Sequence, residues 1–260
     1  MTSAMTTAPE PTVLDKPVLE KYDRRLEPMR AARAFQKLMA DKEDTTQVFV
    51  IMEALTGRST TKGYARLLAS PGGGRIAYAQ EELSQRFSDR DWLKQFAPGT
   101  VGAAYRDFMW SENLSAEGLA MESRKVEAHI DDPHVYAWYS RRLRDIHDVW
   151  HVLTGYGRDA LGEACVVSFS YGQTQSLGFA FIGLGAAQEI HRENGSVPAR
   201  RAVLEAWRNG RRAAWLPAVN YAELFAEPLE DARRRLNIRT PATYASVTKD
   251  VRDALKLRAA

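Results

Sequence analysis

Apolar residues recur every three or four positions from residue 28 onward, and this period is the feature that most constrains the fold. Met29, Ala32, Phe35, Leu38 and Met39 form the first such set. This period places apolar side chains on one face of an α-helix, whereas a half-buried β-strand alternates apolar and polar residues. Because no convincing alternating stretch occurs, the sequence predicts an all-α protein.

Start and stop signals divide the periodic region into helices. Pro133 and Pro198 stand at first-turn positions, and Gly57, Gly157 and Gly195 stand where helices are expected to end. The expected helices lie near residues 28–40, 45–56, 60–69, 74–86, 100–113, 133–155, 160–172, 177–193, 198–214 and 228–236.

The domain organisation follows from the absence of any long linker within residues 28–240. We expect one compact multi-helix domain there, with a long central antiparallel helix pair that carries a metal site and an apolar groove. Residues 1–27 are rich in Thr, Pro and Ala and are expected to form a disordered tail. Residues 241–260 are expected to form an appended helix.

Residues 164–188 form a run of 25 positions without a charged side chain. A transmembrane helix needs about 20 predominantly apolar residues. However, Gln173, Thr174, Gln175 and Ser176 lie at the middle of the run, where a bilayer tolerates polar groups least. We therefore expect two buried helices with a polar break between them.

Composition excludes several classes of protein. The chain has 36 basic and 33 acidic residues, so its net charge of +3 provides no dedicated surface for nucleic acid. Cys165 is the single cysteine, which excludes a disulfide framework and a multi-cysteine metal cage and fits a reducing compartment. Residues 1–27 have neither the apolar core of a signal peptide nor the acid-free, Arg-rich helix of an organellar presequence.

A metal site is predicted in the expected helix 133–155. His147 and His151 lie one helical turn apart, and Asp148 lies beside them, so that all three can reach one ion. This helix is apolar on its other side, and coordination would offset the cost of burying two imidazoles and a carboxylate. A His pair at this spacing also occurs without metal. The remaining histidines, His129, His134 and His191, are expected at surface or capping positions.

The fourth ligand is expected to be Glu163, after the glycine-containing turn at residues 154–158. It is the only acidic residue between Asp159 and Glu189. Two nitrogen and two oxygen donors suit zinc best and also accept ferrous iron or manganese. The spacing matches the His-Glu-x-x-His pattern of zinc proteases, but the acid is an aspartate, one methylene shorter than glutamate, which disfavours a peptidase.

Glycines occur in or beside the two uncharged helices, where each costs about 1 kcal/mol relative to alanine. Gly172, Gly178 and Gly183 are the examples that matter here. They favour either close helix packing or a groove wide enough for a long apolar ligand. Phe179 and Arg144 are the other candidate groove residues, and Arg144 is either a contact for an anionic group or part of a solvated ion pair.

The segment His147-Asp148-x-x-His151, followed by eleven residues and Glu163, resembles the motif of the Coq4 family of ubiquinone (coenzyme Q) biosynthesis proteins. The similarity extends through residues 98–109, 132–163, 206–210, 227–229 and 236–238, which together span most of residues 30–240. Residues 220–224 depart from the tryptophan- and acid-rich stretch of the family, which weakens expectations about partner contacts there.

The resemblance implies a helical protein that binds a metal ion through His147, Asp148, His151 and Glu163 and acts on a polyprenylated quinone precursor. The implied reaction is oxidative decarboxylation of a 4-hydroxybenzoate-derived ring, in which the carboxyl group is replaced by hydroxyl. The alternative is a non-catalytic, lipid-binding scaffold that organises other ubiquinone biosynthesis enzymes. A His-Asp type hydrolase is a weaker possibility, because that class needs further histidines upstream.

The resemblance also implies a location. Without a presequence, the chain is expected to be a bacterial member of the family, in the cytoplasm and peripherally associated with the inner membrane. Helix 198–214, with five arginines, is either a contact for anionic lipid or an ordinary solvated basic face. A homodimer is a further expectation.

Overall fold

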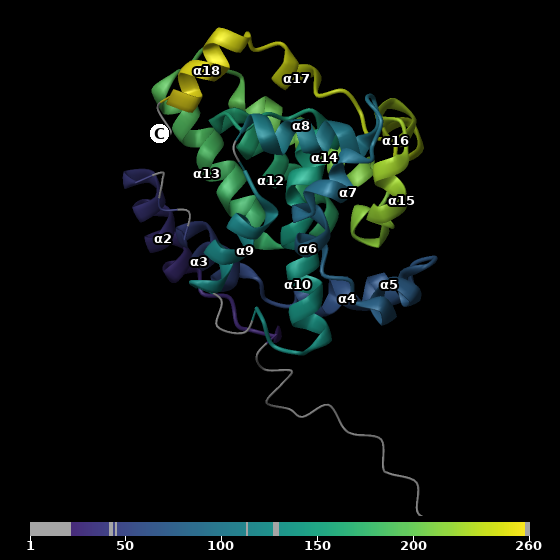
Figure 1. Ribbon diagram of the computed structural model, residues 1–260. Helices are drawn as coiled ribbons and strands as arrows, with labels where there is room; N and C mark the ends of the chain where they lie inside the picture. The colour runs from purple at the N-terminus through teal and green to yellow at the C-terminus, as the bar shows by residue number, and fades with distance from the viewer. Residues whose placement is uncertain (1–21, 42–43, 45, 113, 127–129, 258–260) are drawn as a thin grey trace, which may run out of the picture.

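Helices form nearly all the regular structure in the computed structural model, which describes residues 22–41, 44, 46–112, 114–126 and 130–257 (Figure 1). Within these residues no strand forms, and one isolated β-bridge joins Thr100 and Pro228. The prediction of an all-α, compact multi-helix domain is confirmed. The tail predicted at residues 1–27 lies outside the described residues as far as position 21.

The helices follow the predicted periodicity in most of the chain. Their bounds are α2 (Pro28–Ala40), α3 (Thr46–Leu55), α4 (Ser59–Ala69), α5 (Gly73–Ala79), α6 (Leu83–Ser88), α7 (Arg90–Lys94), α8 (Val101–Ser111), α9 (Ala116–Arg124), α10 (Val135–Asp145), α11 (His147–Thr154), α12 (Ala160–Thr174), α13 (Leu177–Glu193), α14 (Ala199–Arg212), α15 (Tyr221–Ala226), α16 (Leu229–Arg235), α17 (Ala242–Ala245) and α18 (Lys249–Leu257).

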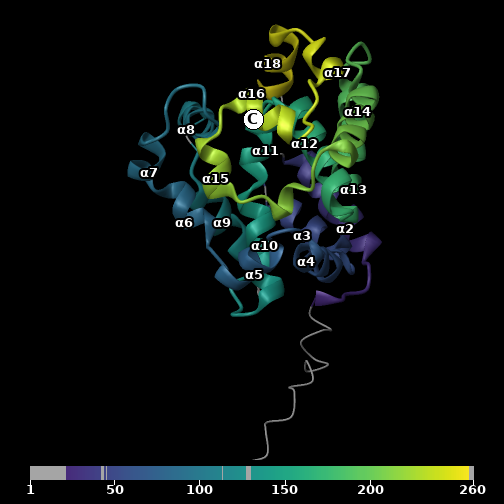
Figure 2. The ribbon, with the colours of Figure 1, turned by 90° about the vertical axis from the view of Figure 1, so that its right-hand side faces the viewer.

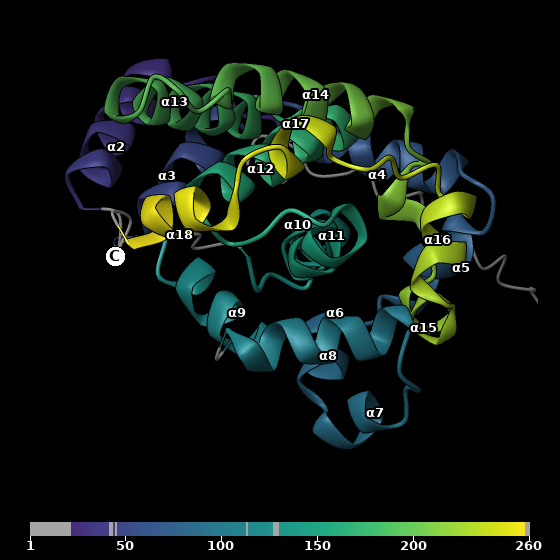
Figure 3. The ribbon, with the colours of Figure 1, turned by 90° about the horizontal axis from the view of Figure 1, so that it is seen from above.

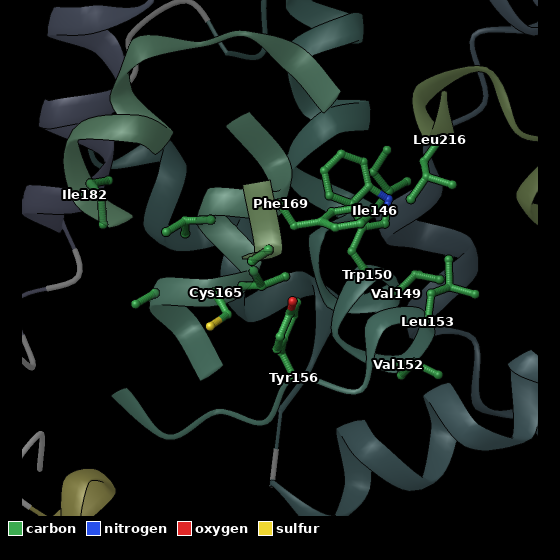
Figure 4. Close-up of a cluster of buried hydrophobic side chains, with 14 of the residues drawn as sticks. Ile146, Val149, Trp150, Val152, Leu153, Tyr156, Cys165, Phe169, Ile182 and Leu216 are labelled. Atoms are coloured by element: carbon green, nitrogen blue, oxygen red, sulfur yellow. The ribbon is translucent and has the colours of Figure 1, made fainter. Parts of the chain in front are cut away.

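Helices α10 and α11 run through the middle of the molecule. Helices α12, α13 and α14 cover one side of them, and α6, α8 and α9 cover the other (Figures 2 and 3). Trp150 of α11 meets Phe169 of α12 at the centre, with ring centroids 6.0 Å apart (Figure 4). The main core therefore lies between the two layers, next to the helices that carry the predicted ligands.

The predicted helix 133–155 is interrupted, and this corrects the expected long central helix pair. Ile146 ends α10 and precedes α11, which has only 8 residues. The interruption follows Asp145, a buried residue whose carboxylate accepts hydrogen bonds from the Ser84 backbone and from Arg144. Tertiary hydrogen bonds of this kind do not show in a hydrophobic pattern. The predicted helix 74–86 is also divided, because Gln80 adopts a left-handed backbone with φ 43°.

Helix α12 packs most extensively against α14 and α13. The close contact with α14 depends on two glycines: a Cβ on Gly172 would lie 2.7 Å from Trp207 O, and one on Gly210 would lie 2.3 Å from Phe169 O. Any larger side chain would force the two backbones apart. Gly178 and Gly183 are likewise at helix contacts, with Met52 and Ser168. Close packing accounts for these predicted groove glycines.

The uncharged run forms two helices, α12 and α13, as predicted, but only α12 is largely buried, since α13 exposes Leu177 and Leu184. Gln173, at the polar break, is buried and fully engaged: its amide nitrogen donates to Gly210 O at 2.6 Å and Ala214 O at 3.1 Å, and its amide oxygen accepts from Leu216 N at 2.8 Å. Among the described helices, none has both the length and the apolar character needed to cross a bilayer.

Replacing Gln173 with leucine is expected to destabilise the protein by about 2–4 kcal/mol, because buried backbone groups at Gly210, Ala214 and Leu216 lose their partners. Urea unfolding monitored by circular dichroism measures the effect. The matched control is Gln95→Leu, since Gln95 is exposed and is expected to change stability by less than about 0.5 kcal/mol. Equal midpoints for the two variants would contradict the expectation.

The C-terminal segment contains two helices, α17 and α18, where one appended helix was expected, and both contact α12. Tyr244, Val247 and Leu255 are buried in the main core. The Tyr244 hydroxyl donates to the Asp159 carboxylate and accepts from Gly157 N at 2.9 Å. The segment therefore contacts the loop between α11 and α12 directly.

Candidate metal centre

Three predicted ligands converge between α11 and α12. His147 is the first residue of α11, His151 lies one turn later, and Glu163 lies in the first turn of α12. Glu163 Oε2 is 3.5 Å from His151 Nε2 and 3.9 Å from His147 Nε2. One ligand atom from each residue lies within 4.8 Å of the others, a spacing that one ion can bridge.

The chain between the two helices sets this geometry. Gly155 ends α11 with φ 78°, and Arg233 donates to the free carbonyl groups of Val152 and Leu153, both at 2.9 Å. Asp159 then caps α12 by accepting from Gly162 N at 3.0 Å. An N-cap of this kind satisfies an otherwise free backbone donor. Glu163 comes directly after Gly162, in the first turn of α12, and is thereby directed back toward the histidines.

The orientation of His151 is determined by its backbone contact. Its Nδ1 lies 2.9 Å from Tyr156 O, and because a carbonyl oxygen only accepts, Nδ1 carries the proton. The ring also stacks on Phe108 at 5.5 Å. In the neutral imidazole, Nε2 then carries no proton, so its lone pair is available to a metal ion. This nitrogen faces Glu163. A hydrogen bond from the second ring nitrogen to a carbonyl is the usual arrangement around metal-binding histidines.

Electrostatics couple these side chains. Burial by itself raises the pKa of Glu163, but attraction to His151 and hydrogen bonds with both histidines outweigh it, and the pKa is lowered. Burial lowers the pKa of His151, yet the Glu163 carboxylate outweighs that effect and the pKa is raised. Two imidazole nitrogens and a carboxylate oxygen that face one another favour a shared cation, either a proton or a metal ion.

Asp148, the remaining predicted ligand, lies outside this three-residue group. It lines the adjoining cavity, as Arg144 and Phe179 do. Arg144 is largely buried and is bound to Asp145 at 2.7 Å and to Ser123 Oγ at 2.8 Å. Arg144 was predicted either to contact an anionic group or to form a solvated ion pair. The structure shows an ion pair, with Asp145, and this pair is buried.

The adjoining cavity has a volume of about 920 Å³ and a predominantly apolar lining. His147 and Glu163 lie on its wall. Its apolar residues come from α2, α3, α10, α12 and α13 and include Phe35, Met39, Met52, Leu143, Val167, Phe179 and Ile182. The three predicted glycines do not line it. An apolar cavity with a few polar groups on one wall is typical of a site for an apolar ligand with a polar head.

The other histidines take the positions that were expected where the structure describes them. His134 caps α10 by accepting from Tyr136 N at 3.2 Å, and His191 is exposed near the end of α13. His129 lies outside the described residues. Two residues of the site were not predicted from the sequence: Arg158, which lies near Glu163, and Tyr156, whose carbonyl orients His151. The only signal for Arg158 was its position in the turn between the two ligand-bearing helices.

The fold and the site define a class: an all-α protein with a His-His-Glu cluster beside an apolar cavity. The model of the family described as coenzyme Q (ubiquinone) biosynthesis protein Coq4 matches residues 28–242. This chain therefore belongs to the Coq4 family.

Similar curated proteins include several from fungi. "Ubiquinone biosynthesis protein COQ4, mitochondrial" of Podospora anserina is 27% identical over 198 residues, which cover 75% of this chain and 62% of that protein. The protein with the same name from Yarrowia lipolytica is 27% identical over 210 residues, which cover 76% of each. In Neurospora crassa the match covers 53% of the relative, so the chain spans only part of some relatives. The bacterial assignment stays a prediction.

A solved structure supports the fold. The crystal structure of a Nostoc punctiforme PCC 73102 protein, described as a ubiquinone biosynthesis protein, matches with a TM-score of 0.58 and 16% identity. The match covers 83% of this chain and all of that one. At this identity the similarity concerns the helical architecture.

Proposed function

We propose that this protein takes part in ubiquinone biosynthesis as a metal-dependent enzyme that removes the carboxyl group from a polyprenylated 4-hydroxybenzoate-derived ring and introduces a hydroxyl in its place. The observation that carries the proposal is the convergence of His147, His151 and Glu163 beside a 920 Å³ apolar cavity, which His147 and Glu163 line. Family membership and the names of the relatives support the pathway.

The donor set fits a divalent metal ion. Two imidazoles and one carboxylate suit zinc, and the same set with open positions is typical of ferrous iron in oxygenases; manganese is a third candidate. Asp148, on the same cavity wall, is the proposed fourth ligand. When bound, the ion would supply Lewis-acid chemistry and, if it is iron or manganese, electron transfer.

The protein's own residues position the reactants. Tyr156 O holds the His151 ring, and Asp159 begins the helix that carries Glu163, so the donors are in place before an ion arrives. The apolar walls exclude water and accept the isoprenoid tail, where each buried methylene contributes about 0.8 kcal/mol. Longer tails should therefore bind more tightly until the cavity is filled.

Turnover separates the enzyme from the scaffold alternative. Protein reconstituted with zinc, iron or manganese is supplied with 3-geranyl-4-hydroxybenzoate, dioxygen and ascorbate, because exchange of carboxyl for hydroxyl consumes oxygen and two electrons. Release of carbon dioxide together with the hydroxylated product supports the enzyme. Binding of the ligand without product with any of the three metals would support the scaffold.

Metal binding is expected to weaken on acidification, since protons compete with the ion for the imidazoles. Because the pKa of His151 is raised above its ordinary value of 6.5, its protonation begins at a higher pH than for a free imidazole. The lowered pKa of Glu163 keeps that carboxylate ionised throughout. Zinc titrations at about pH 6, 7 and 8 should show affinity rising with pH. A pH-independent affinity would contradict this.

We also propose peripheral association with the inner membrane and with other enzymes of the pathway. Helix α14 supports this, because its exposed side carries basic residues: Arg200, Arg201, Arg208, Arg211 and Arg212. Such a face can bind anionic lipid.

A further inference from the structure

Arg158 lies in the turn between the two ligand-bearing helices and has no assigned role. It lines the apolar cavity beside Glu163, and it also lines a smaller cavity of about 270 Å³ with Glu112 and Tyr244. Its side chain is 35% exposed. The guanidinium is therefore accessible to a ligand in the cavity that His147 and Glu163 also line.

Two carboxylates flank Arg158, but neither is within hydrogen-bond distance. Arg158 Nε is 3.7 Å from Glu163 Oε1, and Arg158 Nη1 is 3.7 Å from Glu112 Oε2. Hydrogen bonds between nitrogen and oxygen are about 2.7–3.2 Å long. Among the described residues the guanidinium forms these two long ion pairs and no direct hydrogen bond, so its N–H groups can still donate to a ligand at the site.

The other arginines that line this cavity differ in this respect. Arg144 donates to Asp145 and to Ser123, and Arg24 pairs closely with Glu53. Their guanidinium groups therefore already have close carboxylate partners. Of the three, Arg158 has the weakest contacts, and its Nε lies 3.7 Å from Glu163, one of the candidate metal ligands.

A cation at His147, His151 and Glu163 would weaken the contacts of Arg158 further. It would share the negative charge of Glu163, which weakens the attraction between Glu163 and Arg158. The divalent charge and the guanidinium together would then favour an anion between them. The planar fork of arginine matches a carboxylate in shape and can donate two parallel hydrogen bonds to it.

We infer that Arg158 binds the carboxylate of the ligand and so directs the carboxylated end of the ring toward the metal ligands. This inference rests on the proposed function, because it assigns a specificity-determining residue to the same site. It makes Arg158 responsible for distinguishing a carboxylated prenyl phenol from one that has already lost its carboxyl group. Arg158 would thus favour the substrate over a decarboxylated product.

The test compares two probes by calorimetric titration of zinc-loaded, full-length protein: 3-geranyl-4-hydroxybenzoate and 2-geranylphenol. The variants are Arg158→Met, which keeps an unbranched apolar stem without the guanidinium, Arg158→Lys, which keeps the charge without the fork, and Arg234→Met as the control. Arg234 is exposed on α16 and pairs with Asp231, away from the cavity lining. Zinc content and thermal melting are measured for each variant.

Arg158→Met should weaken binding of the carboxylated probe roughly 10- to 100-fold, which is the usual effect of losing a hydrogen bond to a charged group. The phenol should bind with unchanged affinity, zinc content should stay the same, and Arg158→Lys should restore part of the loss. Unchanged binding of the carboxylated probe, or an equal loss for both probes, would overturn the inference while leaving the proposed function intact. Failure of the unmodified protein to bind either probe would overturn both.

Discussion

His151→Ala is expected to lower metal affinity by at least about 100-fold, so that the protein purified without chelator loses its metal. Loss of a partner that merely orients a ligand costs 10- to 100-fold, and His151 would be a ligand itself. The side chain is only 1% exposed, and its Nε2 faces Glu163 at 3.5 Å. No solvent molecule can easily restore the missing nitrogen with the same orientation.

Elemental analysis measures the effect directly, with His191→Ala as the matched control. His191 is exposed near the end of α13 and is not part of the three-residue group. The control should keep the metal content of the unmodified protein. Metal retained at full occupancy by His151→Ala would refute the site, whichever reaction the protein performs.

Trp150→Ala is expected to destabilise the protein by about 3–5 kcal/mol, the usual cost of removing a large buried aromatic side chain. Trp150 is buried between α11 and α12, and its indole nitrogen donates to the Tyr221 hydroxyl at 2.9 Å. The substitution leaves a cavity beside Phe169 and removes one of the two hydrogen-bond partners of the buried Tyr221 hydroxyl. Urea unfolding monitored by circular dichroism provides the measurement.

The matched control is Trp110→Ala, because Trp110 on α8 is 44% exposed. Its loss should cost about 1 kcal/mol or less. A similar midpoint for the two variants would mean that the centre of the molecule is not packed around Trp150. Metal content after Trp150→Ala then shows whether the site survives when the contact between α11 and α12 is loosened.

The comparison of sequence and structure shows where local signals suffice. The bounds predicted for residues 177–193 and 28–40 agree with α13 and α2, because both helices have clear ends and apolar faces. The helix expected at 133–155 is interrupted at Ile146. The preceding residue, Asp145, accepts a hydrogen bond from the backbone of the distant Ser84, and a local pattern does not show such a contact. Short helices such as α7 and α15 have too few residues for a period to be detected.

Several features were determined by the sequence alone: the helical class, the division of residues 164–188 into two helices, and the placing of His147 and His151 one turn apart. Each depends on spacing along one helix, and that spacing is local. The tertiary structure decided that Glu163 reaches both histidines while Asp148 lies outside the group, that the glycines serve helix packing, and that Arg158 faces the cavity. These features depend on how far apart separate helices lie, which packing determines and no single segment encodes.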